Sequence, residues 1–192
     1  MANQVQFAGL SRLLHWTMAV MVLAMLFIGI AMVASLEDYH WLVSIHKPLG
    51  MVILILVIIR LINRWLINSP PPLPADMPSW DRFAANASIF TLYVLMFALP
   101  LVGWGMLSAA GYPIVLFGPL CLPPILPADP GIYALLRKTH TVLAFLLFAT
   151  FIAHFSGAMM HALIFRDGLF ESMVSIRGRS GEKSSSSTRS AG

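Results

Sequence analysis

Three histidines recur at seven-residue steps in the last apolar stretch of the chain. This stretch, residues 139–165, contains His140, His154 and His161, with Leu147 at the vacant step. Because seven residues are close to two helical turns, all four positions share nearly one face of a helix. His140 and His154 are then roughly 21 Å apart along the helix axis and about 40° apart around it. Polar side chains are costly in lipid, so such a row indicates a function in the middle of a bundle.

The composition places the chain in a membrane. Hydrophobic residues make up 58% of the 192 residues and charged residues only 10%, and the mean hydropathy is +0.81. A soluble domain is usually about a quarter charged. Cys121 is the single cysteine, which excludes an internal disulfide and the CxxCH attachment of c-type haem, so any haem would be held without a covalent link. The formal charge of +4 does not indicate nucleic-acid binding, because the basic residues lie at span ends and in the tail rather than in one patch.

Apolar stretches long enough to cross a bilayer predict an all-α, integral membrane four-helix bundle of up-down topology. The predicted spans cover about residues 13–36, 42–66, 83–109 and 138–165. The first is too long for the apolar core of a signal peptide, so we expect it to be retained.

The segments between and after the spans are rich in proline or serine. Residues 69–74 predict a rigid connector, Pro100 predicts a kink in the third helix, and four prolines predict a re-entrant or surface loop at residues 110–136. We expect one transmembrane domain at residues 1–176 and a disordered cytoplasmic tail at residues 177–192.

The basic residues predict that both termini are cytoplasmic. With that topology, nine of the 12 lysines and arginines lie inside and three lie outside. The outside three are Lys47, Arg137 and Lys138. This excess satisfies the positive-inside rule.

The up-down topology places four intramembrane histidines at two depths. His15 begins the first span inside, and His46 begins the second outside. His140 begins the fourth span outside, and His154 lies fourteen residues further in. The depths therefore pair His46 with His140 and His15 with His154. Two facing imidazoles without a nearby thiolate suit six-coordinate haem iron, and bundle cores commonly hold such cofactors.

Three alternatives to haem remain open for the intramembrane histidines. A zinc site is disfavoured because the spans lack carboxylates and cysteine. A proton pathway is the second alternative. A haem-free transporter is the third, and it predicts no Soret band.

Several segments, in order along the chain, resemble the bacterial cytochrome b561 family of di-haem inner-membrane proteins. They are Arg12–Trp16 (RLLHW), Ile45–Gly50 (IHKPLG), Ile59–Arg64 (IRLINR) and Ala98–Trp104 (ALPLVGW), together with His140 and His154. The resemblance spans roughly residues 10–170 and implies two non-covalent haems b in a four-helix bundle. It implies His15, His46, His140 and His154 as the axial ligands, in the pairs that their depths predict.

The resemblance also implies electron transfer, most specifically from periplasmic superoxide to ubiquinone. In this frame Arg60 and Arg64 could bind haem propionates, although ordinary snorkelling to the inner surface explains them nearly as well. Lys47, Arg137 and Lys138 adjoin the outer ligands and form a cationic collar that could steer superoxide.

A quinone site is predicted at the inner end of the last span. His161 could donate to a quinone carbonyl, with Ser11 and Trp16 nearby. The alternative is a histidine at the headgroup level that only hydrogen-bonds water.

A second hypothesis is a cytochrome b anchor subunit that exchanges electrons between the quinone pool and a partner dehydrogenase or a periplasmic redox protein. The chain lacks a substantial extramembrane domain for docking, but an exposed apolar surface on the 110–136 loop would favour it. The sequence leaves a homo-oligomer open.

Overall fold

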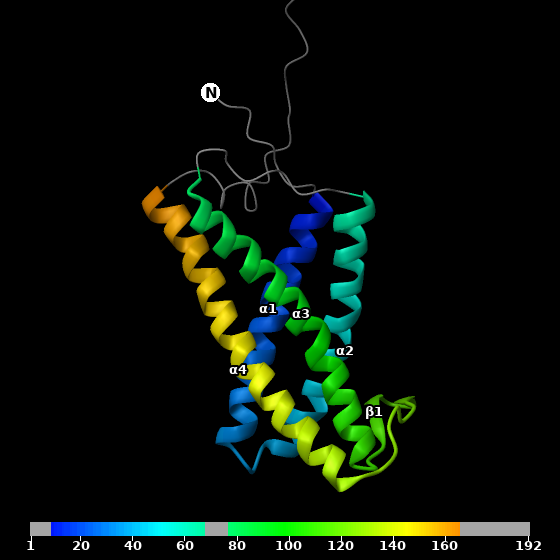
Figure 1. Ribbon diagram of the computed structural model, residues 1–192. Helices are drawn as coiled ribbons and strands as arrows, with labels where there is room; N and C mark the ends of the chain where they lie inside the picture. Colours follow the sequence, from blue (N-terminus) through cyan, green and yellow to red (C-terminus); the bar gives the residue numbers. More distant parts are fainter. Residues whose placement is uncertain (1–8, 68–76, 166–192) are drawn as a thin grey trace, which may run out of the picture.

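The structure, a computed structural model, describes residues 9–67 and 77–165. Four long helices run up and down in turn (Figure 1). They are α1 (Gly9–Ala34), α2 (Tyr39–Ile62), α3 (Ser79–Ala109) and α4 (Pro130–Met160). A π-helical turn, η1 (Asn63–Ile67), extends α2, and a second one, η2 (His161–Phe165), extends α4. All four helices are long and apolar enough to cross a membrane, as predicted.

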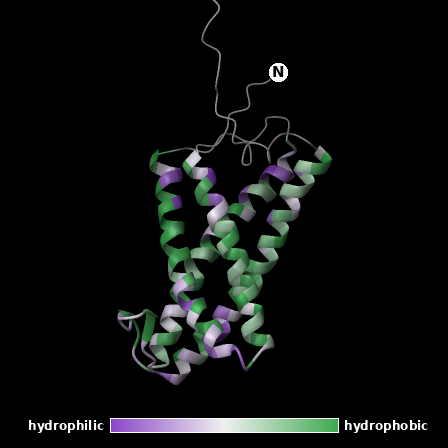
Figure 2. Cartoon of the chain, turned by 180° about the vertical axis from the view of Figure 1, so that it is seen from behind, coloured by the Kyte–Doolittle hydropathy of each residue, from purple (hydrophilic) through white to green (hydrophobic). Residues whose placement is uncertain are grey.

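The two ends of the bundle differ in their helix ends and in their loops. At the hairpin end, α1 and α3 finish, α2 and α4 begin, and a small β-hairpin lies beside α3 (Figure 1). At the opposite end, here called the termini end, α1 and α3 begin. Hydrophobic residues cover the middle of the helices, and hydrophilic residues gather toward both ends (Figure 2). This pattern is what a bilayer requires of the helix surfaces.

The best-buried part of the core lies half-way along the bundle. Each helix contributes apolar side chains to it: Met18 and Val22 from α1, Ile53 and Val57 from α2, Leu95 and Leu99 from α3, and Leu147 from α4. Leu147 is 5% exposed and is the buried residue of α4. Because Leu147 lies midway between His140 and His154, the histidine stripe of α4 faces the interior of the bundle.

The helices begin earlier than the predicted spans, at residues 9, 39, 79 and 130 instead of 13, 42, 83 and 138. Hydropathy marks the part of a helix that lies in hydrocarbon, whereas hydrogen bonding continues through the polar residues before it. The largest difference is in α4, where the Asp129 side chain accepts a hydrogen bond from the Ile132 N–H and Pro130 occupies the first turn. An aspartate cap followed by proline is a strong helix start.

The expected 110–136 loop is therefore shorter, and part of it is ordered as strands. β1 (Ile114–Phe117) and β2 (Leu120–Leu122) pair antiparallel, and Gly118, with φ +48°, allows the tight turn between them. This hairpin is an exception to the all-α prediction among the described residues. Helix α3 continues through Pro100 to Ala109 without interruption. The 69–74 connector and the tail at residues 177–192 lie outside the described residues.

Candidate functional site

The structure brings His46 and His140 together at the hairpin end. Their ring centroids are 6.2 Å apart, and the rings are inclined at 65°. Nδ1 of each ring is buried; that of His46 has no hydrogen-bond partner among the described residues, whereas the His140 ring lies within hydrogen-bonding reach of the Leu99 backbone. A neutral histidine that binds a metal through Nε2 keeps its proton on Nδ1, so each of two buried, facing rings offers one nitrogen to a metal.

Gly103 on α3 makes room for His140. A Cβ at Gly103 would lie 3.4 Å from Cε1 and 3.7 Å from Nδ1 of the His140 ring. The glycine therefore lets α3 approach the imidazole directly. No sequence pattern identifies this role of Gly103, because its contact with α4 depends on the packing of two helices.

His15 and His154 form the second pair, toward the termini end. The two imidazoles are close enough to interact electrostatically, and both interact with the guanidinium of Arg60. Arg60 donates from Nη2 to Nδ1 of His15 at 3.0 Å and from Nε to the Tyr93 hydroxyl at 2.8 Å. Arg60 thus links α2 to α1 and α3.

Ser88 on α3 favours one tautomer of His154. Its hydroxyl donates to the Ala85 carbonyl at 2.9 Å, so its one hydrogen is already used. While that bond is kept, Ser88 Oγ, 3.3 Å from Nδ1 of His154, accepts a hydrogen bond from the ring. With the proton on Nδ1, the Nε2 lone pair of His154 is free to bind a metal. Sequence reasoning missed Ser88, because a lone serine in a span carries no signal of its partner.

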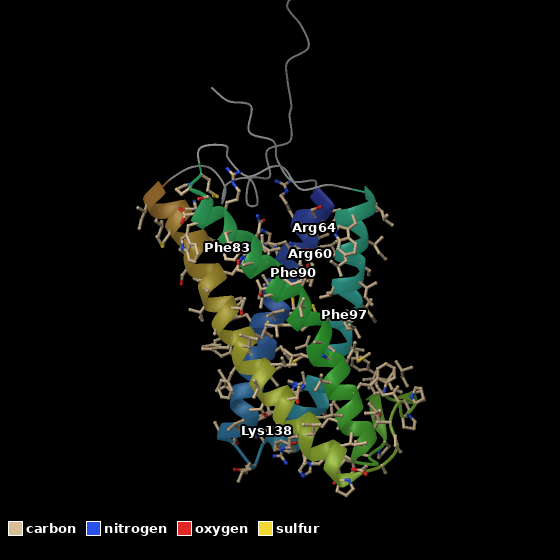
Figure 3. All side chains as sticks on the ribbon, in the orientation of Figure 1. Arg60, Arg64, Phe83, Phe90, Phe97 and Lys138 are labelled. Atoms are coloured by element: carbon tan, nitrogen blue, oxygen red, sulfur yellow. The ribbon has the colours of Figure 1, made fainter. Side chains whose placement is uncertain are left out.

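The remaining predicted residues divide between the two ends. Lys47 follows His46, and Arg137 and Lys138 precede His140, all at the hairpin end. Arg137 donates to the Tyr133 hydroxyl at 3.3 Å. Arg60 and Arg64 lie toward the termini end, opposite Lys138 (Figure 3).

The three predicted quinone-site residues all lie toward the termini end. Ser11 accepts a hydrogen bond from Asn63, and Trp16 meets the His15 ring edge-on at a centroid distance of 5.6 Å. His161 begins η2 and is half-buried. His161 is one heptad beyond His154 and so continues its stripe.

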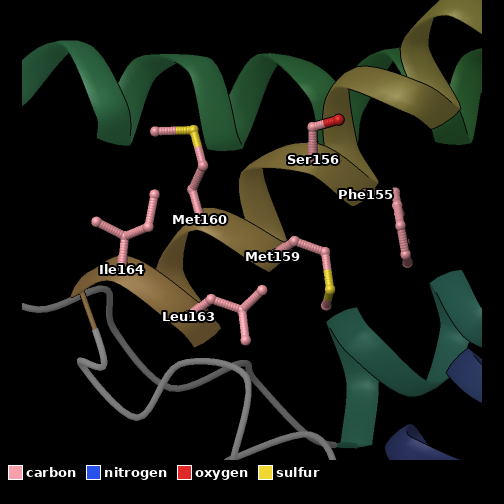
Figure 4. Close-up of a pocket in the computed structure, with 6 residues that line it drawn as sticks. All are labelled: Phe155, Ser156, Met159, Met160, Leu163 and Ile164. Carbon is pink, nitrogen blue, oxygen red and sulfur yellow. The ribbon is translucent and has the colours of Figure 1, made fainter.

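An apolar groove of about 260 Å³ follows the end of α4, but it is not part of this site. All six lining side chains come from α4 and η2 (Figure 4): Phe155, Ser156, Met159, Met160, Leu163 and Ile164. At about 100° per residue, their common face is nearly opposite to that of His154 and His161. The groove therefore belongs to the lipid-facing surface.

The paired histidines fit haem better than zinc. Two metal–nitrogen bonds of about 2 Å would hold two facing ring centres about 6 Å apart, which agrees with the first pair. A structural zinc site needs four ligands and a catalytic one three. Within residues 9–67 and 77–165, no three histidine, cysteine, aspartate or glutamate side chains gather as such a site.

The model of the prokaryotic cytochrome b561 family matches residues 6–175. The chain belongs to this family. It is 32% identical over 176 residues to cytochrome b561 homolog 2 of Escherichia coli, covering 88% of this chain and 91% of that protein. It is 26% identical over 162 residues to a probable superoxide oxidase, CybB, of Yersinia pestis, covering 84% and 91%. A second Escherichia coli protein, cytochrome b561 homolog 1, is 25% identical over 174 residues, covering 85% and 94%.

Membership settles the general function that the histidines indicated. The chain is a membrane electron-transfer protein, and a cytochrome b of this family binds haem b. Four apolar helices and a prokaryotic membrane cytochrome family indicate a multi-pass protein of the inner membrane.

Proposed function

We propose that this cytochrome b561 holds two haems b, one between His46 and His140 and one between His15 and His154. The observation that carries the proposal is the presence of two imidazole pairs on either side of Leu147 in the middle of the core. Bound haem supplies one-electron redox chemistry, while the protein sets position, ligand basicity and surrounding charge. Two redox centres at different depths would carry electrons across a low-dielectric layer in two steps.

Arg60 is proposed to change partners when the second pair binds iron. A guanidinium can only donate, so its bond to Nδ1 of His15 leaves the proton of a neutral ring on Nε2. Iron ligation through Nε2 then requires Arg60 to leave Nδ1. A haem propionate is the charged acceptor that would best replace this contact. Arg64, one turn further along, is a second candidate for the propionates.

We further propose that electrons enter from superoxide at the hairpin end and leave to ubiquinone at the termini end. Two superoxide anions give up one electron each and become oxygen, and one quinone takes two electrons and two protons. The name of the Yersinia pestis relative supports this reaction, and the distribution of basic residues supports cytoplasmic termini. Superoxide is then oxidised at the periplasmic face.

The charges at the hairpin end restrict how superoxide could be guided there. Lys47, Arg137 and Lys138 carry three positive charges at this end, while three carboxylates offset them. The carboxylates are Glu37, Asp38 and Asp129. Three minus three leaves no net charge, so attraction has to be local to Lys47 and its neighbours rather than a property of the whole end.

His161 is proposed to donate a hydrogen bond to the quinone. Its place on the His154 stripe, half-buried near the termini end, supports this role. We expect His161→Ala to slow quinone reduction while both haems stay bound, and stopped-flow oxidation of the reduced protein by a short-chain ubiquinone measures this. His161→Gln, which keeps a donor, should recover part of the rate. Wild-type rates in His161→Ala would leave the histidine with a structural role only.

Proteoliposomes test the complete reaction. Superoxide generated outside the vesicles should reduce ubiquinone dissolved in their bilayer, and superoxide dismutase or the His46→Ala change should abolish this. Reduction that persists with dismutase present would exclude superoxide as the donor. A partner protein that copurifies in equal amount would instead favour the anchor-subunit hypothesis.

A further inference from the structure

The outward face of the β-hairpin is apolar and exposed. Val115, Phe117 and Leu120 are 38%, 60% and 55% exposed. Cys121 is exposed as well, and it pairs with Val115 across the ladder, whose register shifts between Val115 and Phe117. No formal charge occurs between residues 83 and 128. A two-stranded hairpin is marginally stable in water, and one with two apolar faces needs cover on both.

The inward face is covered by the bundle. Ile114 is 4% exposed and sits where β1 contacts α2 and α3. Leu126, just after the hairpin, packs against Gly105 so closely that a Cβ there would lie 3.2 Å from Leu126 Cδ1. In Figure 1 the hairpin accordingly lies beside the last turns of α3 rather than beyond them.

Polar groups of α3 satisfy the backbone that follows the hairpin. The indole N–H of Trp104 donates to the Pro123 carbonyl at 2.9 Å, and the Ile125 N–H donates to Ser108 Oγ at 3.1 Å. The Asp129 N–H donates to the Ala109 carbonyl at 2.9 Å. Non-helical backbone at membrane depth requires such protein partners, whereas a loop in water does not.

We propose that the outward face of this hairpin lies in the boundary between lipid headgroups and acyl chains, as a membrane-contacting element beside the four spans. Exposed apolar side chains also cover the four spans. Exposed aromatic residues mark the same end of the bundle: Tyr39 at 42%, Trp41 at 64% and Tyr112 at 66%. Such residues gather at membrane–water interfaces.

The occupant favoured by the chemistry is lipid rather than a redox partner. Transient electron-transfer partners recognise one another through small surfaces with complementary charge. This face offers no charge, and the basic residues at this end belong to α2 and α4. The loop therefore has the exposed apolar surface that an anchor subunit would use for a partner, but we infer that this surface contacts the bilayer.

The single native cysteine provides the test. Cys121 in the haem-loaded protein is labelled with a nitroxide in phosphatidylcholine–phosphatidylglycerol liposomes, and the accessibility of the label to oxygen and to a water-soluble nickel chelate is measured. Two control sites are placed in a Cys121→Ser background: Glu37→Cys in the exposed loop at the same end and Phe90→Cys, whose native side chain is 70% exposed in mid-span.

Lipid contact predicts that the oxygen-to-nickel ratio at Cys121 is several-fold higher than at Glu37→Cys and nearer to that at Phe90→Cys. A ratio equal to that of Glu37→Cys would place the hairpin in water and overturn the proposal. Poor access of both reagents would also overturn it, because a second copy or a partner protein would then cover the face. The absorption spectrum of each labelled sample verifies that haem is retained.

Discussion

Ser88 illustrates how a single hydroxyl would prepare His154 for its proposed role as a ligand. By giving its hydrogen to the Ala85 carbonyl, Ser88 leaves only an acceptor for Nδ1–H of His154. Partners of this kind fix the tautomer of a ligating histidine and raise its basicity, and their loss typically weakens metal binding about 10–100-fold.

We therefore expect Ser88→Ala to release one of the two haems about 10–100-fold faster than wild type. Transfer of haem to excess apomyoglobin measures this rate, and the other haem should leave at its wild-type rate. Ser88→Thr, which keeps the hydroxyl, should restore retention. Equal loss of both haems, or no change, would show that Ser88 does not support His154 as a ligand.

At the scale of elements, the close approach of α3 to α4 positions the His140 ring. Gly103 lies one turn from Leu99 of the core and faces the His140 ring on α4. A methyl group there would lie in van der Waals contact with the imidazole, and a larger side chain would require the ring or a helix to move.

Replacement of Gly103 is expected to have a graded effect. Gly103→Ala should keep both haems with little change in the low-spin electron paramagnetic resonance signals, because the added methyl group only contacts the ring. Gly103→Val should bind about one haem per chain, as measured by pyridine haemochrome. Two haems with unchanged signals in Gly103→Val would show that α3 does not constrain this ligand.

The sequence predicted the helices better than what joins them. Hydropathy located all four spans because lipid demands long apolar stretches, and the seven-residue steps identified the inward face of α4. The hairpin was missed because β1 and β2 are short and apolar throughout, without the alternation that marks a half-buried strand. The early start of α4 was signalled by Asp129 and Pro130, and prolines in the preceding loop obscured it.

The site was predictable to the extent that depth determines it. Span order alone paired His46 with His140 and His15 with His154, and the structure brings these same residues together. The contacts of Arg60 with His15 and Tyr93 depend on rotamers and on packing between helices. No spacing in the sequence encodes such contacts, so the roles of Tyr93 and Ser88 could not be predicted from it.

At the scale of the whole molecule, charge is balanced at the hairpin end, so the proposed steering of superoxide has to be short-ranged. Replacing Lys47, Arg137 and Lys138 together with glutamine leaves only carboxylates there. We expect slower reduction by superoxide and a reversed salt dependence, because net repulsion is screened as salt rises. Stopped-flow reduction at several ionic strengths measures both. An unchanged rate at low salt would exclude steering, and a charge-neutral variant that also replaces Glu37, Asp38 and Asp129 is the control.

The paired-ligand architecture is tested most directly by a dithionite-reduced minus oxidised spectrum, with pyridine haemochrome quantitation, of wild type and four histidine-to-alanine variants. We expect two haems b per wild-type chain. His46→Ala and His140→Ala should lose the same haem, and His15→Ala and His154→Ala should lose the other, as judged by which α-band component disappears. One haem in the wild type, or variants that group in any other way, would contradict this architecture.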